Sequence, residues 1–338
     1  CKTIGSPIEL QGRTGVQRRD RIAGMAHPRK FRFGAELKGP FPGLTWQQTV
    51  QRVEELGYST LFVPDHFQLQ YGPITAMASA VAYSDTLHVG SLVFDNDYRH
   101  PVTLAMEMAT IDEISQGRLE FGIGAGWKTL DYEQSGIPLD PPKVRVERMM
   151  EAVVAIKALF GPDPVDLDGE HYQLAGVTGT VPHTPGGPPL LIAGGAKRML
   201  RFAGEHASIV GVNPSIHSGA IDADSAADAL AERMDQKVAW VKEGAGDRFD
   251  DLEINAWVAV ASLTDDAAGF AEVLAPGFGL DGQDPLTVLD SPMTMVGTVE
   301  EIGERLHARR DRWGFSYHVV QGDKALEMAP VVAALAGL

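Results

Sequence analysis

Residues 59–68 read STLFVPDHFQ, and this stretch gives the first indication of the fold. Its first half is apolar and β-prone, and it follows a helical pattern that stops at Gly57. Pro64 then breaks the strand, and Asp65 and His66 come directly after it. Because active sites of α/β barrels lie at the carboxyl ends of the strands, this acid and this histidine are candidates for catalysis. A helix cap beside a hydrogen-bonded histidine is the simpler alternative.

The order of short apolar strand, turn and amphipathic helix repeats along the chain. Strands are expected at 31–37, 60–66, 87–96, 118–126, 189–195, 208–213, 252–261 and 316–321. Helices are expected at 45–57, 74–84, 100–115, 144–160, 197–206, 225–245 and 327–338. Eight alternating units predict an α/β fold, a (β/α)8 TIM barrel forming one domain over residues 31–338. A doubly wound open sheet is the alternative, but it usually has fewer strands.

Two insertions interrupt this rhythm, after strands four and seven. Residues 161–188 contain DLDGEHYQL, which predicts a β-hairpin, and then a loop rich in proline and glycine. Residues 262–297 contain APGFGLDGQDP, which is rich in glycine, proline and aspartate. Both segments adjoin strand ends, so both are candidate lids over a site, with surface elaboration as the alternative.

The first thirty residues differ from the rest of the chain. Residues 1–30 are basic, polar and aperiodic, so we expect a disordered N-terminal arm. Met25, just before the first expected strand, is an alternative start. Cys1 is the one cysteine, which excludes disulfides within the chain and cysteine-based zinc sites.

The charge balance bears on the kind of partner. The chain has 45 acidic and 29 basic residues, a net charge of −16. Such a field repels nucleic-acid backbones and anionic membrane surfaces, so neither is expected as a partner. No apolar run approaches the roughly 20 residues that span a bilayer. We therefore expect a cytoplasmic protein that acts on a small organic molecule.

Motifs for other chemistries are absent from the sequence. The first expected strand, FRFGAEL, lacks the His-x-His of metal-dependent barrel hydrolases, and the other histidines show no metal-ligand spacing. No Gly-x-Ser-x-Gly elbow for a nucleophilic serine is present. A metal site is therefore not expected, and acid–base work by His66 or Asp65 remains.

Glycines mark the ends of two strands. GIGAGW, residues 122–127, matches only half of a dinucleotide fingerprint. A better explanation of these glycines is that they keep the strand end small, so that a flat ligand can approach the backbone. Residues 193–195, Ala-Gly-Gly, precede a helix that begins near Lys197 and Arg198. Amides at a helix start reinforced by cations suit a phosphate, with a plain turn as the alternative.

Taken together, these residues resemble the bacterial-luciferase-like monooxygenase superfamily. The similarity is carried by Asp65-His66, by the long block 87–127, by the Gly169–Tyr172 turn and by 190–213. It extends over about residues 31–338 and looks strongest to the branch that uses the deazaflavin coenzyme F-420 (8-hydroxy-5-deazaflavin). Relatives that use FMN are the alternative. The resemblance also implies a homodimer.

The resemblance implies a role for residues at several strand ends. His66 would lie against the coenzyme ring and handle a proton, with Asp65 beside it. A bulge in the third strand, often with a non-prolyl cis peptide, would support the ring, and Leu92-Val93 falls there. The other implied contacts are Asp95 at the polar edge of the ring, Gly124, Ala125 and Gly126 along the ring or its side chain, and Ala193, Gly194, Gly195 and Asn213 at the phosphate.

Two positions depart from the pattern of sugar-phosphate dehydrogenases in this branch. Trp127 stands where they have an acid, and Gln70 stands where they have a tryptophan. These departures argue against a sugar phosphate as substrate. We expect an oxidoreductase that transfers a hydride between F-420 and an organic substrate over its ring. The alternatives are an FMN-dependent monooxygenase and a non-catalytic flavin-binding carrier.

Overall fold

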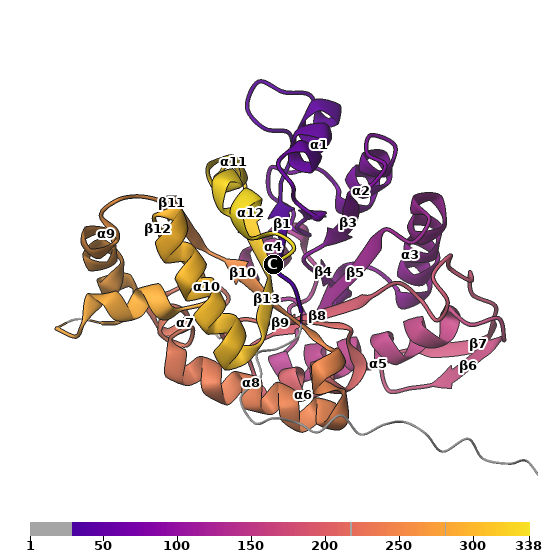
Figure 1. Cartoon of the computed structure of the whole chain (residues 1–338). Coiled ribbons are helices and arrows are strands. Elements are labelled where there is room, and N and C mark those ends of the chain that lie inside the picture. Colours follow the sequence, from indigo (N-terminus) through magenta and orange to yellow (C-terminus); the bar gives the residue numbers. More distant parts are fainter. Residues whose placement is uncertain (1–28, 217, 281) are drawn as a thin grey trace, which may run out of the picture.

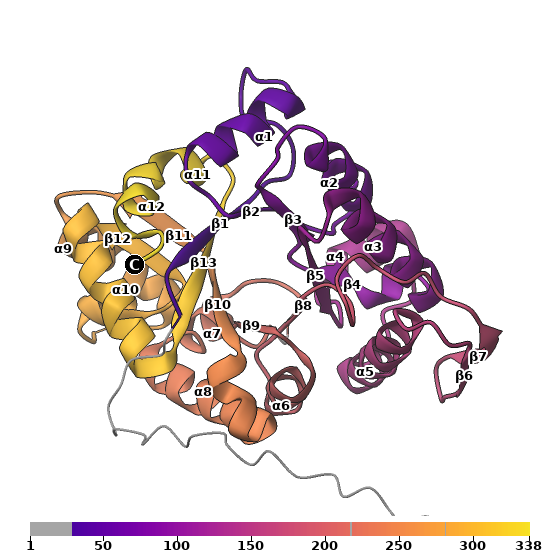
Figure 2. The same ribbon diagram turned by 45° about the vertical axis from the view of Figure 1, so that its right-hand side comes forward.

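A closed barrel of parallel strands forms the centre of the computed structural model, which describes residues 29–216, 218–280 and 282–338 (Figures 1 and 2). The ring consists of β1 (Arg32–Glu36), β2 (Thr60–Val63), β3 (His88–Ser91), β5 (Leu119–Gly124), β8 (Leu190–Gly194), β9 (Ile209–Val212), β10 (Glu253–Val258) and β13 (Phe315–Gln321). Neighbours pair in parallel, and β1 with β13 closes the ring. The predicted (β/α)8 barrel is therefore confirmed. The predicted N-terminal arm lies, up to residue 28, outside the described residues.

Helices cover the outside of the barrel (Figure 2). The main ones are α1 (Trp46–Glu55), α2 (Pro73–Val81), α3 (Pro101–Ser115), α5 (Pro142–Leu159), α6 (Lys197–His206), α8 (Ala231–Ala245), α10 (Val299–Trp313) and α12 (Ala329–Leu335). Shorter helices are α4 (Thr129–Ser135), α7 (Ala223–Ala227), α9 (Ala267–Leu274) and α11 (Lys324–Glu327), with 3₁₀ turns η1 (Asn96–Tyr98), η2 (Gly246–Asp251), η3 (Ala275–Phe278) and η4 (Pro285–Asp290). Local sequence sets many of these boundaries: Thr45 and Thr298, for example, start α1 and α10 with capping boxes.

Three expected elements are divided in the structure. The third strand breaks at Leu92-Val93 and resumes as β4 (Phe94–Asp95), which pairs with β5. The seventh ends at residue 258, and β11 (Val260–Leu263) leaves the barrel to pair with β12 (Thr294–Gly297). The expected helix 225–245 was wrong as one element. Asp228, at the end of α7, accepts a hydrogen bond from the Ser215 amide, and Leu230 is extended, so α8 starts afresh.

The two insertions take different forms. Residues 161–188 contain the expected hairpin, β6 (Val165–Asp168) and β7 (Gln173–Val177), and Glu151 of α5 accepts three amide hydrogen bonds from its turn. Residues 262–297 contain β12, α9, η3 and η4, which enclose a small apolar core of their own. In both views α9 lies at the periphery, beyond α10 (Figures 1 and 2).

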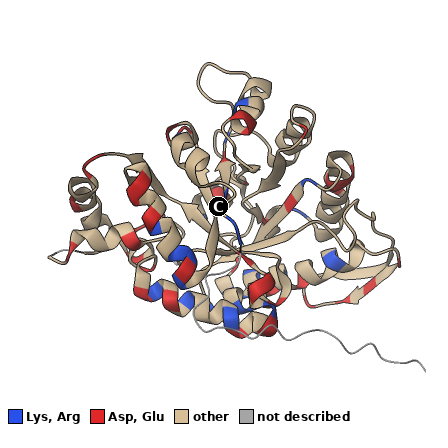
Figure 3. Cartoon of the chain, in the orientation of Figure 1, with Lys and Arg blue, Asp and Glu red and all other residues tan. Residues whose placement is uncertain are grey.

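Charged side chains lie mainly on the surrounding helices (Figure 3). Basic and acidic residues both occur along α6, α8 and α10, so the net negative charge is not gathered on one of these elements (Figure 3). Within the described part of the chain, no helix is both long and apolar enough to cross a membrane.

Candidate active site

The predicted site residues come together at one end of the barrel, because all eight strands are parallel. They stand at or just after the carboxyl ends of β2, β4, β5, β8 and β9. Strand register brings pairs of them into contact. Asp95 pairs with Gly124 across β4 and β5, and the amide of Asn213 donates to the carbonyl of Gly194 over 2.9 Å. The barrel geometry therefore gathers residues from Asp65 to Asn213 around one mouth.

An apolar layer inside the barrel forms the floor of this mouth. Its buried members are Phe62, Leu191, Ile209, Tyr317 and Val319, with Leu92, Val93 and Ala193 packed against them. The peptide bond between Leu92 and Val93 is cis, at the bulge where the resemblance placed it. A Cβ on Gly124 would lie only 2.8 Å from a methyl group of Val93. The floor is thus an apolar surface with no side chain at Gly124.

His66 is hydrogen-bonded to an acid that the sequence analysis did not identify. Its Nδ1 lies 2.5 Å from Oδ2 of Asp131, whose side chain is fully buried. A carboxylate oxygen accepts, so Nδ1 carries the hydrogen and Nε2 is left available. Burial lowers the pKa of His66, which Asp131 only partly offsets. The ring of Trp127 meets the His66 ring edge-on, with centroids 5.8 Å apart.

Asp131 comes from α4, the short helix that follows the glycine end of β5. Position 127 is a tryptophan, and the acid that contacts His66 stands four residues later in the chain. The sequence signals here concern a helix only: the segment TLDYEQS contains the helix formers Leu, Glu and Gln, and Gly136 is a typical helix end. What could not be read from the sequence is that this helix lies against the end of β2.

Asp65 bonds to an arginine rather than to His66. Arg99 makes two hydrogen bonds to its carboxylate, at 2.5 and 2.9 Å, and the amide of Asp95 donates to it over 3.0 Å. Asp65 is 5% exposed. This arrangement ties the end of β2 to the segment after β4. Asp65 therefore positions the backbone that carries His66, and its charge still favours the protonated form of His66.

Asp95 lies in a second buried network beside the glycine turn. Its carboxylate accepts from the Tyr132 hydroxyl at 2.9 Å and from the Asp97 amide at 2.9 Å. Burial nevertheless raises the pKa of Asp95 to about 7. A Cβ on Gly126 would collide with the Tyr132 hydroxyl and the Asp95 carboxylate, and φ there is +70°. The carbonyl of Gly126 accepts from Arg145 over 2.7 Å, which fixes this turn.

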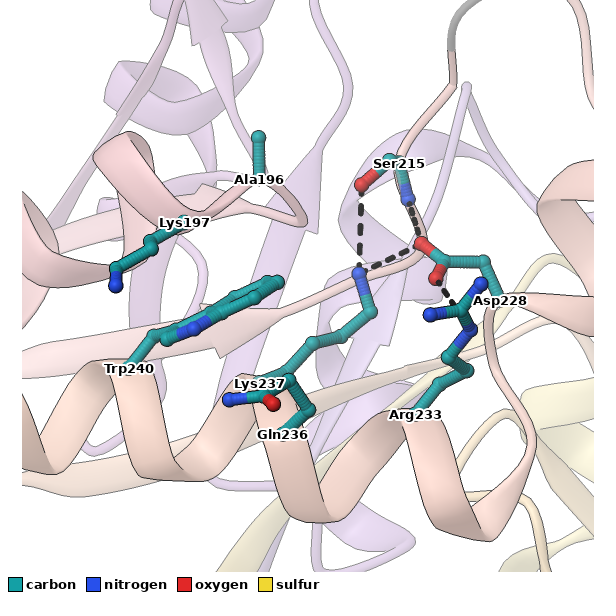
Figure 4. A pocket seen from close by; sticks show the side chains of 8 residues that line it. All are labelled: Ala196, Lys197, Ser215, Asp228, Arg233, Gln236, Lys237 and Trp240. Carbon is teal, nitrogen blue, oxygen red and sulfur yellow. Dashed lines mark hydrogen bonds and ion pairs between the residues drawn. The ribbon is translucent and has the colours of Figure 1, made fainter.

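The second glycine end, at β8, opens beside a cavity of about 220 Å³ (Figure 4). Its lining residues are Ala196, Lys197, Ser215, Asp228, Arg233, Gln236, Lys237 and Trp240. Helix α6 starts here with no side-chain cap on its first amides and no acid in its first turn. Amides and the helix dipole at such a start favour an anion.

Lys237 is bonded to the backbone of the glycine turn that follows β8. Its ammonium group donates to the Gly195 carbonyl at 2.7 Å and pairs with Asp228 at 2.7 Å, and its side chain is 2% exposed (Figure 4). Burial lowers the pKa of Lys237, and Asp228 offsets part of that effect. Lysine 237 was not identified from the sequence, because its spacing along α8 is that of an ordinary amphipathic helix.

These features fit a flat, phosphorylated coenzyme. The apolar floor at Leu92-Val93, which Gly124 approaches closely, suits a flat ring, and the uncapped start of α6 suits a phosphate. The Oδ1 atom of Asn213 is buried without a hydrogen-bond partner, and a hydroxyl of a ribityl chain would satisfy it. Among the described residues, no group of three or more His, Cys, Asp or Glu side chains is arranged to hold a metal.

The barrel with its site at the carboxyl ends of the strands defines a class of α/β-barrel proteins that includes many enzymes. A family model described as luciferase-like monooxygenase matches residues 39–273. The chain therefore belongs to the luciferase-like monooxygenase family.

Curated relatives with similar sequences include enzymes named for coenzyme F-420. The chain is 33% identical over 162 residues to an F-420-dependent glucose-6-phosphate dehydrogenase of Nocardia farcinica, covering 45% of this chain and 47% of that protein. It is 30% identical over 187 residues to a 5,10-methylenetetrahydromethanopterin reductase of Archaeoglobus fulgidus, covering 55% and 54%. The matches thus span about half the length of these relatives.

Solved structures share the fold at low sequence identity. An F-420-dependent tetrahydromethanopterin reductase from Methanopyrus kandleri has a TM-score of 0.67 at 17% identity, covering 91% of this chain and all of that one. The oxygenating component of 3,6-diketocamphane monooxygenase from Pseudomonas putida, in complex with FMN, has a TM-score of 0.62 at 16% identity, covering 91% and 96%. At this identity the likeness concerns the fold alone.

Proposed function

We propose that this protein is an oxidoreductase that transfers a hydride between coenzyme F-420 and an organic substrate bound over the coenzyme ring. The observation that carries the proposal is the His66–Asp131 pair, which stands beside an apolar, glycine-lined floor suited to a ring. When bound, the deazaflavin supplies the hydride chemistry. The protein binds and orients the reactants, excludes water and moves one proton.

His66 is the proposed proton-handling group. Asp131 holds its Nδ1–H, so Nε2 is the atom that takes or gives the proton. Burial keeps the ring neutral over more of the pH range, so that Nε2 begins as a base. Trp127 packs edge-on against the imidazole ring of His66, where it limits the access of water to that histidine.

The remaining predicted residues have binding roles in this proposal. Leu92, Val93, Gly124, Ala125 and Gly126 contact the ring or the start of its side chain, and Asp95 stands at its polar edge. Ala193, Gly194, Gly195 and Asn213 receive the phosphate-bearing tail, with Lys237 fixing the loop from behind.

The most useful experiment is to measure binding of F-420 and of FMN side by side. Tighter binding of F-420 supports the proposal, whereas tighter binding of FMN overturns the choice of coenzyme. The second candidate, an FMN-dependent monooxygenase, is favoured by the luciferase-like monooxygenase family to which the chain belongs. It predicts oxygen consumption in the presence of FMN and a flavin reductase.

A turnover screen separates the enzyme from a non-catalytic carrier. Chemically reduced F-420 is offered with enones, nitro compounds and ketones, and oxidised F-420 with alcohols. Oxidation of the reduced coenzyme, or reduction of the oxidised coenzyme, with any of these compounds supports an enzyme. Binding of the coenzyme without turnover in the whole panel favours the carrier, whereas the Asp131 carboxylate beside His66 supports the enzyme.

A further inference from the structure

A buried carboxyl group on β1 lies in the barrel mouth and has no part in the functions described above. Alternate residues of a strand point to the same side. Arg32 reaches Glu253 inside the barrel, and the space beside Gly34 is filled by Phe62 and Val319 of the floor. Glu36 follows in the same alternation, one layer nearer the carboxyl end. It therefore faces the lumen directly above the apolar floor.

The side chain of Glu36 has one hydrogen-bond partner among the described residues. The indole Nε1 of Trp257, on β10, donates to its Oε2 over 2.6 Å. The nearest strand neighbour, Gln321 of β13, turns its amide to the carbonyl of Val258 instead. Oε1 is left without a protein donor, although Glu36 is only 8% exposed. A ligand oxygen bound in the mouth can therefore form a hydrogen bond with Oε1.

The position of this pair relative to the floor indicates what it contacts. β1, β13 and β10 are consecutive in the ring, whereas Leu92-Val93 and Ala193 come from β3, β4 and β8 on the other part of it (Figure 2). A ring resting on Leu92 and Val93 leaves the Glu36–Trp257 side of the mouth to a second molecule.

We propose that Glu36 and Trp257 form the recognition site for the substrate, and that they select an uncharged organic molecule with a carbonyl or hydroxyl oxygen. The indole of Trp257 provides an apolar wall, and the Glu36 carboxyl group hydrogen-bonds the oxygen of the substrate. This inference rests on the proposed function and specifies its substrate class.

The chemistry of the pocket favours a neutral ligand over an anion. Burial raises the pKa of Glu36 to about 7, with Trp257 and the exposed Lys38 offsetting the effect in part. Near neutral pH a large share of the carboxyl group is therefore protonated and donates a hydrogen bond. Above that pH it is a carboxylate, which repels an anionic substrate. A preference for neutral ligands agrees with Gln70 and Trp127, which depart from the pattern of the sugar-phosphate dehydrogenases.

Binding of simple probes tests the inference without a known substrate. Saturation-transfer NMR is recorded with cyclohexanone and with cyclohexanecarboxylate, with and without F-420, for the wild-type chain and for Glu36→Leu. Glu36→Gln keeps a donor, and Glu304→Leu, an exposed change on α10, is the matched control.

Cyclohexanone is expected to bind the wild-type chain near pH 5.5 and more weakly near pH 8.5. Glu36→Leu should weaken binding near pH 5.5 by about tenfold, the loss of one hydrogen bond. Glu36→Gln should bind at both pH values, and Glu304→Leu should behave as wild type. If Glu36→Leu does not fold, Glu36→Gln serves as the test: binding that no longer depends on pH supports the inference, and binding that keeps the wild-type pH dependence contradicts it.

Three results would overturn the inference: no binding of cyclohexanone to the wild-type chain, an unchanged pH profile in both Glu36 variants, or tighter binding of cyclohexanecarboxylate than of the ketone. Failure of the proposed function is seen separately, as absence of coenzyme binding, because the probes are also tested without F-420.

Discussion

Nδ1 of His66 lies 2.5 Å from Oδ2 of Asp131, although the two residues are 65 positions apart in the chain. The second oxygen of Asp131 is buried and has no hydrogen-bond partner among the residues that the structure describes, so His66 is the one partner of this carboxylate there. Such a bond fixes the tautomer and the orientation of an imidazole. It turns a strand-end histidine into a group with one defined nitrogen available for proton transfer.

Asp131→Asn is expected to lower turnover by about 100-fold, because general acid–base catalysis contributes ~10²–10⁴ in rate. The affinity for the coenzyme should change little, since Asp131 does not reach the floor. His66→Ala should show the same pattern. Loss of coenzyme binding with the fold intact, or unchanged turnover, would contradict the assigned role.

A spectroscopic measurement tests the same pair without turnover. Long-range ¹H–¹⁵N NMR should find His66 protonated at Nδ1 in the wild-type chain. In Asp131→Leu the preference for this tautomer should disappear. A wild-type His66 protonated at Nε2 alone would show that Asp131 does not hold it in solution.

Gly124→Ala is expected to weaken coenzyme binding by about tenfold, because the new methyl group forces Val93 to move in the packed floor. Gly72→Ala is the matched control, since nothing lies within 4 Å of a Cβ there and φ is −63°. Titration of both variants with F-420 and with FMN measures the effect. Equal affinities of the two variants would place the ring elsewhere.

Lys237→Met should affect phosphorylated and unphosphorylated ligands differently. The change frees the Gly195 carbonyl and loosens the loop at the start of α6. FMN should bind about tenfold more weakly, from the loss of a charge-assisted hydrogen bond that holds the loop, while riboflavin should keep its affinity. Calorimetric titration with both compounds measures this, and an equal loss for the two would argue for a general change in fold.

His318 should make the stability of the protein depend on pH. The ring is fully buried beside Phe31 and Phe33, and burial lowers its pKa from 6.5 to about 3, with Arg309 adding to the effect. Between these values the unfolded chain binds a proton that the folded chain does not. The unfolding free energy should therefore fall by about 1.4 kcal/mol for each unit of pH below 6.5.

His318→Leu should remove this part of the pH dependence. Denaturant titrations of both chains at pH 7.5 and near pH 5 measure it, and the difference between the variant and the wild type should grow by about 2 kcal/mol toward the lower pH. A difference that stays constant with pH would mean that His318 protonates in the folded state near its usual pKa.

The sequence by itself determined the fold and the outline of the site. Eight apolar strands alternating with helices admit few arrangements, because both faces of each strand must be buried. Parallel strands then place every strand end at one mouth. The local context of His66, Gly124 and Gly194 therefore made them candidates, and the family resemblance supplied the roles expected of them. Strand breaks at Leu92-Val93 and Ala259 lay within the expected segments.

Only the tertiary structure decided which side chains act together. Asp131 and Lys237 occupy ordinary helical positions, and nothing in the local pattern relates them to β2 or to Gly195. Glu36 has the pattern of an ordinary strand end, and only the fold brings Trp257 of β10 into hydrogen-bond contact with it. Hydrogen bonds and desolvation depend on atoms from distant segments, whereas periodicity reports only the neighbours along the chain.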